Sequence, residues 1–199
     1  MTEQTKDKHK QRQQKVKEHV DARVEAAQEV KGIFQVITGN GKGKSTSGFG
    51  VVARCVGHGQ KAAVCQFIKG TWECGERNLL LGAGVEFAVM NTGFTWDTQN
   101  KEADTLAAQA TWQEAKRMLA DSSINLVLLD ELTYMVTYGY VDLDEVLSAL
   151  NNRPAMQSVI ITGRAAHRAL TDLADTVSEV RNVKHAFDSG VKALEGFDY

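Results

Sequence analysis

The fold of this 199-residue chain is decided by one stretch, Ile33-Phe34-Gln35-Val36-Ile37-Thr38-Gly39-Asn40-Gly41-Lys42-Gly43-Lys44-Ser45. Its first half is apolar and predicts a β-strand, and its second half is rich in glycine and lysine. Glycines let backbone N–H groups turn towards phosphate oxygens, and a helix that follows directs its positive end at the same anion. The stretch therefore predicts a strand, a phosphate-binding loop and a helix, the arrangement that binds a nucleoside triphosphate with magnesium.

Each polar part of this loop has a predicted task. The Lys44 ammonium reaches the terminal phosphates, and the Ser45 hydroxyl ligates Mg²⁺. The predicted nucleotide-binding residues are Gly39, Asn40, Gly41, Lys42, Gly43, Lys44, Ser45 and Thr46. The general pattern has glycine where this chain has Thr38, so the match fails at one position. The alternative is a lysine-bearing surface turn, and the strand before and the helix after favour the phosphate site.

Composition restricts the class of protein. The formal net charge is −2, which gives no bulk attraction to nucleic acid. The apolar runs are too short to span a bilayer, and the polar N-terminus lacks a secretory apolar segment, so we expect a cytoplasmic protein. The three cysteines show neither Cys-x-x-Cys spacing nor a cluster with histidine, which argues against a zinc or iron–sulfur site.

Apolar β-rich runs alternate with helical patterns from Ile33 onward. This alternation predicts an α/β fold with a mainly parallel six-stranded sheet covered by helices on both faces. Strands are expected at 33–38, 61–68, 84–90, 124–129, 158–162 and 177–181. Helices are expected at 44–56, 100–119, 142–151 and 166–173. The domain they form is expected to span residues 32–199.

Residues 1–31 form a separate N-terminal region. Its first part is charged and polar, which predicts a disordered arm. From about Gln13 the sparse apolar stripe Val16, Val20, Val24 predicts an amphipathic helix to about Glu29. This helix is either a solvated arm, a lid on the domain or a contact with a second copy.

The run 124–129 ends in two carboxylates, Asp130 and Glu131. In phosphate-loop proteins an aspartate at such a strand end holds magnesium, and a neighbouring glutamate binds the metal or polarises a water. The alternative is a helix start enriched in acids, which the helix dipole favours. With the phosphate loop upstream we expect magnesium ligation by at least one of the two, and the sequence leaves open which. An ATPase, a kinase and another ATP-dependent transferase all fit these residues.

Two further loops carry aromatic residues. Trp72 follows the second expected strand, and Phe94 and Trp96 follow the third. Open parallel sheets bind ligands at the carboxyl ends of their strands, so these loops lie on the edge that carries the phosphate loop. They predict a wide, flat and partly apolar second substrate, unless the rings merely pin the loops to the core.

Six motifs together resemble the bacterial ATP:corrinoid adenosyltransferases, of the cytoplasmic enterobacterial type, from about Gln11 to Tyr199. The motifs are Gly39–Ser45, Gln66–Gly70, Gly75–Asn78, Thr92–Trp96, Leu129–Tyr134 and Val183–Phe187. One departure is Ser45, where threonine is common in the family, and it keeps the hydroxyl. The resemblance implies a P-loop NTPase-like (RecA-like) fold that uses ATP and a corrinoid.

The resemblance also implies the chemistry. Family members transfer the 5′-deoxyadenosyl group of ATP to Co(I) and release triphosphate, in cobalamin biosynthesis and salvage. Lys44 would stabilise the leaving triphosphate, while Phe94 and Trp96 would exclude the lower axial ligand of cobalt. A separate reductant such as flavodoxin and a homodimer are implied as well. A plain ATPase or kinase and a non-catalytic binding module remain the alternatives, and the preferred corrinoid is not predicted.

Overall fold

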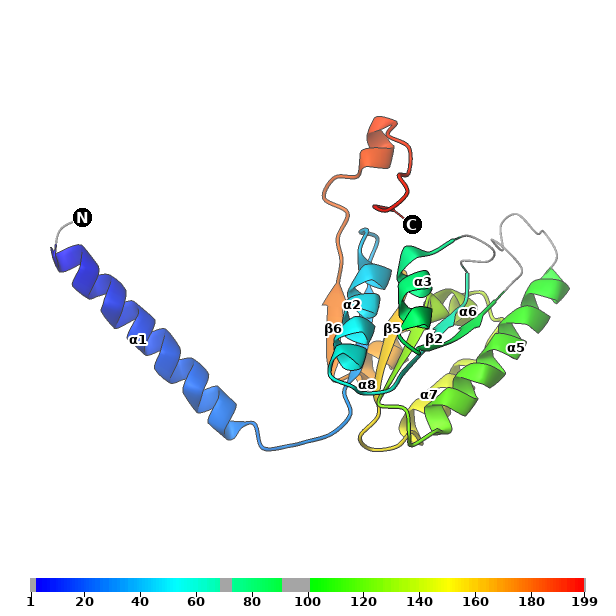
Figure 1. Ribbon diagram of the computed structural model, residues 1–199, viewed down its shortest axis with the longest axis horizontal. Coiled ribbons are helices and arrows are strands. Elements are labelled where there is room, and N and C mark those ends of the chain that lie inside the picture. The colour runs from blue at the N-terminus through cyan, green and yellow to red at the C-terminus, as the bar shows by residue number, and fades with distance from the viewer. Residues whose placement is uncertain (1–2, 69–72, 91–100, 199) are drawn as a thin grey trace. The chain divides into compact units, whose positions relative to one another are not determined.

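The computed structural model describes residues 3–68, 73–90 and 101–198. The chain divides into two compact units, Met1–Val30 and Lys31–Tyr199. The first unit is dominated by helix α1, Glu3–Ala26, drawn in blue in Figure 1. This helix begins earlier than expected, because lysine, glutamine and glutamate favour helix, and the prediction of a disordered arm was wrong for the described residues. The valine stripe of the helix is exposed to solvent.

The second unit is built on a six-stranded sheet in which every recorded strand pair is parallel. The strands are β1 Phe34–Thr38, β2 Ala62–Gln66, β3 Glu86–Val89, β4 Leu126–Asp130, β5 Ser158–Thr162 and β6 Thr176–Glu179. Their order is β3-β2-β4-β5-β1-β6, so β5 separates the phosphate-loop strand from the strand that ends in carboxylates. The predicted fold class is confirmed.

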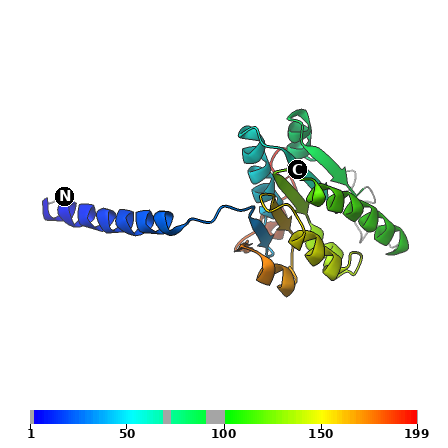
Figure 2. The ribbon, with the colours of Figure 1, turned by 90° about the horizontal axis from the view of Figure 1, so that it is seen from below.

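Helices cover both faces of this sheet, as Figures 1 and 2 show. The helices are α2 Lys44–Gly57, α3 Gly75–Gly82, α5 Lys101–Ala120, α6 Leu132–Thr137, α7 Leu143–Asn151, α8 Arg168–Leu173 and the short 3₁₀ helix η1 Ala186–Ser189. Helices α3 and α6 and the 3₁₀ helix were not predicted. No helix among the described residues is long and apolar enough to cross a membrane.

The core consists of two apolar layers, one on each face. Along β4, Val127 and Leu129 pack with α5, α6, α7 and α8, while Leu126 and Leu128 pack with α2 and α3. Side chains of a strand alternate between faces, and both faces are buried here, which is why these strands read as continuous apolar runs. All six strands point their carboxyl ends to one edge, and the loops of interest leave from that edge.

Candidate functional site

The phosphate loop connects β1 to α2, as the sequence predicts. Gly43 has φ of 112° directly before the helix, and Lys44 is the first helical residue. The Lys44 side chain is buried, with 7 % of its surface exposed, and its Nζ donates to the Gly41 carbonyl at 2.7 Å. The free N–H groups at the start of α2 and the Lys44 ammonium therefore face the same small volume, which suits a phosphate chain.

Thr38 occupies the position where the general pattern has glycine, and the structure shows why this is tolerated. Thr38 is the last residue of β1, and its Oγ1 accepts a hydrogen bond from the Ala166 N–H at 3.3 Å. The reversal of the chain occurs one residue later, at Gly39, where φ is 103°. The conformational freedom that the loop needs is thus present but shifted by one position.

The loop rests on the backbone that continues from β6. The Val180 N–H donates to the Thr38 carbonyl at 2.8 Å, and the Gly41 N–H donates to the Val180 carbonyl at 2.7 Å. A β-carbon at Gly39 would lie 2.4 Å from the Val180 oxygen, whereas one at Gly43 would meet nothing within 4 Å. Close approach to a neighbouring backbone therefore requires glycine at 39, and only the positive φ requires it at 43.

This difference makes two similar substitutions unequal. We expect Gly39→Ala to lower the free energy of unfolding by about 2–4 kcal/mol, because strain and a backbone clash act together. Gly43→Ala adds strain alone, and we expect a loss of about 1–2 kcal/mol. Urea unfolding of both variants measures the difference. Equal losses would show that the contact with Val180 does not hold the loop.

The two carboxylates at the end of β4 have different surroundings. Asp130 is fully buried; its Oδ1 accepts from the Thr162 hydroxyl at 2.7 Å and its Oδ2 lies 3.5 Å from the Gln66 amide nitrogen. Glu131 is partly exposed and has φ of 64°. Its N–H donates to the same Thr162 hydroxyl at 3.0 Å. Thr162 thus links the two residues and fixes the backbone from which the Glu131 side chain extends.

Charges converge on the phosphate loop. Burial lowers the pKa of Lys44; nearby Glu131 and Asp130 act against this shift, and nearby Arg164 adds to it. The carboxylates of β4 and the cation of the loop after β5 therefore share one electrostatic environment with Lys44. An environment of this kind, in which burial and specific charges act on one lysine, is typical of functional sites.

The oxygen donors fit a magnesium site that is completed by substrate. Mg²⁺ prefers oxygen ligands and is usually held by one or two carboxylates together with phosphates and water. The half-exposed Ser45 hydroxyl and the Glu131 carboxylate supply such donors. Within the described ranges, no group of three His, Cys, Asp or Glu residues is assembled that could hold a metal by itself.

The remaining predicted residues are placed as follows. Asn40, Lys42 and Thr46 are exposed, and Lys42 Nζ forms an ion pair with Asp198 at 2.6 Å.

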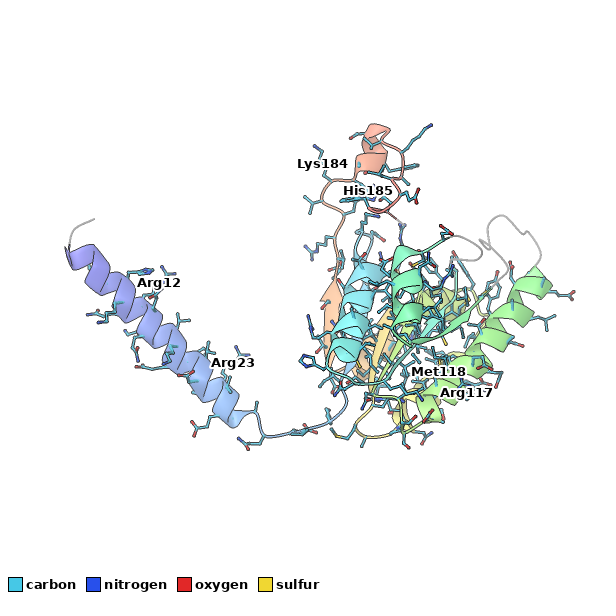
Figure 3. The ribbon with its side chains drawn as sticks, in the orientation of Figure 1. Arg12, Arg23, Arg117, Met118, Lys184 and His185 are labelled. Atoms are coloured by element: carbon cyan, nitrogen blue, oxygen red, sulfur yellow. The ribbon has the colours of Figure 1, made fainter. Side chains whose placement is uncertain are left out.

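Asp198 belongs to the C-terminal segment whose Lys184 and His185 are labelled in Figure 3. A groove beside Lys42 is lined by this segment, mostly by apolar side chains that include Phe187, Leu194 and Phe197. Trp72, Phe94 and Trp96 lie outside the described residues.

Sequence reasoning missed Thr162, Gln66 and Arg164. Thr162 and Gln66 are buried polar residues at the carboxyl ends of strands, and that position was the available signal. Arg164 follows β5, and its proximity to Lys44 depends on β5 lying next to β1, which no local sequence pattern shows.

Comparisons with known proteins point to one family. Residues 30–199 match a family profile described as ATP:corrinoid adenosyltransferase BtuR/CobO/CobP. A curated protein of Escherichia coli strain K12 named corrinoid adenosyltransferase is 66 % identical over 193 residues, covering 97 % of this chain and 98 % of that protein. Corrinoid adenosyltransferase CobA of Salmonella typhimurium strain LT2 shows the same identity and coverage. A corrinoid adenosyltransferase of Pseudomonas aeruginosa is 44 % identical over 194 residues, 96 % of either chain.

Proposed function

This chain belongs to the ATP:corrinoid adenosyltransferase family, and we propose that it transfers the 5′-deoxyadenosyl group of Mg-ATP to the Co(I) of a reduced corrinoid, releasing triphosphate. One observation carries the proposal: the family match extends over residues 30–199 and so includes the phosphate loop and both carboxylates. The buried Lys44 next to Glu131 supports it, because a leaving triphosphate needs cations already in place.

In this reaction the ribose C5′ carbon gains one bonding electron pair from cobalt and gives up another to the leaving oxygen. Co(I) donates an electron pair to the C5′ carbon of the ribose, and cobalt becomes formally Co(III). The C5′–O bond breaks, and its electron pair leaves on the α-phosphate oxygen of the triphosphate. No proton is transferred, so the site needs no general base, and a water aimed at the phosphates would only waste ATP.

We assign direct magnesium contact to Ser45 and Glu131 and a positioning role to Asp130. Both oxygens of Asp130 lie against Thr162 and Gln66 within the core, whereas Glu131 is partly exposed and is the stronger of the two carboxylate influences on the Lys44 charge. Magnesium bound there would neutralise phosphate charge. Lys44 and the loop N–H groups would hold the chain of phosphates so that the C5′ carbon faces the corrinoid.

The proposal also includes where the corrinoid binds, what reduces it and how the protein assembles. The apolar groove beside Lys42 and the aromatic loops predicted from the sequence suit a wide, partly apolar substrate. We further propose that the protein acts in cobalamin biosynthesis and salvage in the cytoplasm. It would work as a homodimer and receive electrons from a transient reductant such as flavodoxin. The helix of residues 1–31 is proposed as a lid or a dimer contact.

Phe94 and Trp96 are proposed to exclude the lower axial ligand, which makes cobalt easier to reduce. We expect Phe94→Ala and Trp96→Ala to lower adenosylation by about 10-fold or more, since a dry apolar shell tunes the potential of a metal. ATP affinity should stay near that of the wild type. Adenosylation rates and ATP titrations check this, and unchanged turnover in both variants would remove the residues from the mechanism.

One assay separates the candidate functions. The protein is incubated without oxygen with Mg-ATP and a chemically reduced corrinoid. Triphosphate together with a light-sensitive carbon–cobalt product supports the transferase. ADP with phosphate would support an ATPase, and binding without turnover would support a non-catalytic module.

A further inference from the structure

The loop between β5 and α8 is tied by hydrogen bonds at the edge that carries the phosphate loop. The Gly163 N–H donates to the Ile37 carbonyl at 3.2 Å, which ties the loop to β1. On the other side, the Thr133 hydroxyl donates to the Arg164 carbonyl at 2.7 Å, which ties it to α6. Arg164 is thus fixed at its backbone between the elements that supply the phosphate loop and Glu131.

The backbone on both sides of Arg164 is unusual. Ala165 has φ of 48°, a left-handed conformation that residues with a side chain rarely adopt. Gly163 has φ of 138°, and a β-carbon there would lie 2.0 Å from the Thr133 hydroxyl oxygen. Strain of this kind persists where surrounding contacts enforce it, and it gathers at ligand-binding sites. In this loop the strained backbone lies on both sides of Arg164, whose side chain is exposed to solvent at the sheet edge.

The Arg164 guanidinium acts on the site electrostatically. It is one of the charges that lie near Lys44 and near Tyr134. No hydrogen bond or ion pair within the described part of the chain holds this guanidinium. By contrast, Arg168 pairs with Asp172 at 3.2 Å and Arg181 pairs with Glu179 at 3.3 Å. Lys44 and Arg164 therefore bring two positive charges to the same edge of the sheet, beside Glu131.

We propose that Arg164 is a further catalytic residue, which binds oxygens of the triphosphate opposite Lys44 and stabilises it as the leaving group. This inference rests on the proposed function for its catalytic part, while the binding part concerns phosphate alone. A guanidinium presents a planar fork of donors that matches two phosphate oxygens, which an ammonium cannot do. Negative charge grows on the phosphate chain as the C5′–O bond breaks, so the contact strengthens in the transition state.

The test compares Arg164→Gln and Arg164→Lys with Arg168→Gln, a matched control because Arg168 is exposed and pairs with Asp172. Inorganic tripolyphosphate is titrated into each magnesium-loaded protein, and ATP-dependent adenosylation is measured with a chemically reduced corrinoid. For Arg164→Gln we expect tripolyphosphate affinity to fall about 10-fold or more and kcat to fall about 10²-fold or more, with Arg164→Lys between it and the wild type. The control should match the wild type.

Two outcomes would overturn the inference. Wild-type tripolyphosphate affinity in Arg164→Gln would place the guanidinium away from the phosphates, whatever happens to kcat. A fall in affinity with unchanged kcat would remove its catalytic role. Thermal unfolding checks that each variant is folded. The titration contains no corrinoid, so it remains decisive for phosphate binding even if the wild type splits ATP into ADP and phosphate, the result that would refute the proposed function instead.

Discussion

Replacing Lys44 with methionine is expected to lower the rate of adenosylation by about 10²–10³-fold, the loss typical when one preorganised donor to a developing negative charge is removed. Methionine keeps most of the apolar stem and removes the charge. The ammonium lies next to the Gly41 carbonyl and is almost fully shielded from solvent, so water cannot take its place at the phosphates without movement of the loop.

The same substitution should leave the fold intact. Burial lowers the pKa of Lys44, which means that the folded protein disfavours the charged form that function requires. Removing that charge is therefore expected to keep or raise the midpoint of thermal unfolding. Lys61→Met is the matched control, because Lys61 is exposed and pairs with Asp121. A rate for Lys44→Met within threefold of the wild type would remove Lys44 from the mechanism.

Substitution of the two carboxylates is expected to give opposite phenotypes. Glu131→Gln keeps size and backbone but weakens a magnesium ligand, so we expect the Mg²⁺ concentration for half-maximal rate to rise about 10-fold or more. Its stability should change little. Asp130→Asn disturbs a buried acceptor of the Thr162 hydroxyl, and we expect a loss of about 1–3 kcal/mol in the free energy of unfolding.

Magnesium titrations of the rate and urea unfolding of both variants measure this contrast. The proposed roles require that Glu131→Gln shift the magnesium dependence more than Asp130→Asn does. The reverse order would make Asp130 the direct ligand. Such a result would also require the Thr162 and Gln66 contacts of Asp130 to open when the metal binds.

The sheet could be predicted from the sequence because its strands are buried on both faces. Runs such as Leu126–Asp130 are continuously apolar until the carboxylate that ends them, and the phosphate loop locates the first strand and helix together. The short helix α6 was not predicted, for a physical reason. Leu132–Thr137 has only six residues, which is less than two turns, and its β-branched and aromatic content does not favour helix.

The sequence places some members of the candidate site next to one another and leaves others far apart. Lys44 and Ser45 follow the strand directly, and Asp130 and Glu131 end another strand. The Glu131 N–H and the Thr162 hydroxyl that it binds lie 31 positions apart in the sequence. Arg164 lies near Lys44 only because β5 lies between β1 and β4. Strand order depends on the packing of the whole sheet, so no local pattern contains it.

In the proposed reaction the bond between the ribose C5′ carbon and its oxygen breaks, and the triphosphate leaves whole. ATP labelled with ¹⁸O at the oxygen that joins C5′ to the α-phosphate tests this directly, in an anaerobic reaction with chemically reduced corrinoid. If the C5′–O bond breaks, mass spectrometry will find the entire label in triphosphate and none in the adenosylated corrinoid. Label in ADP or in a nucleoside product would contradict it, because the bond would then have broken between phosphates or at the α-phosphorus.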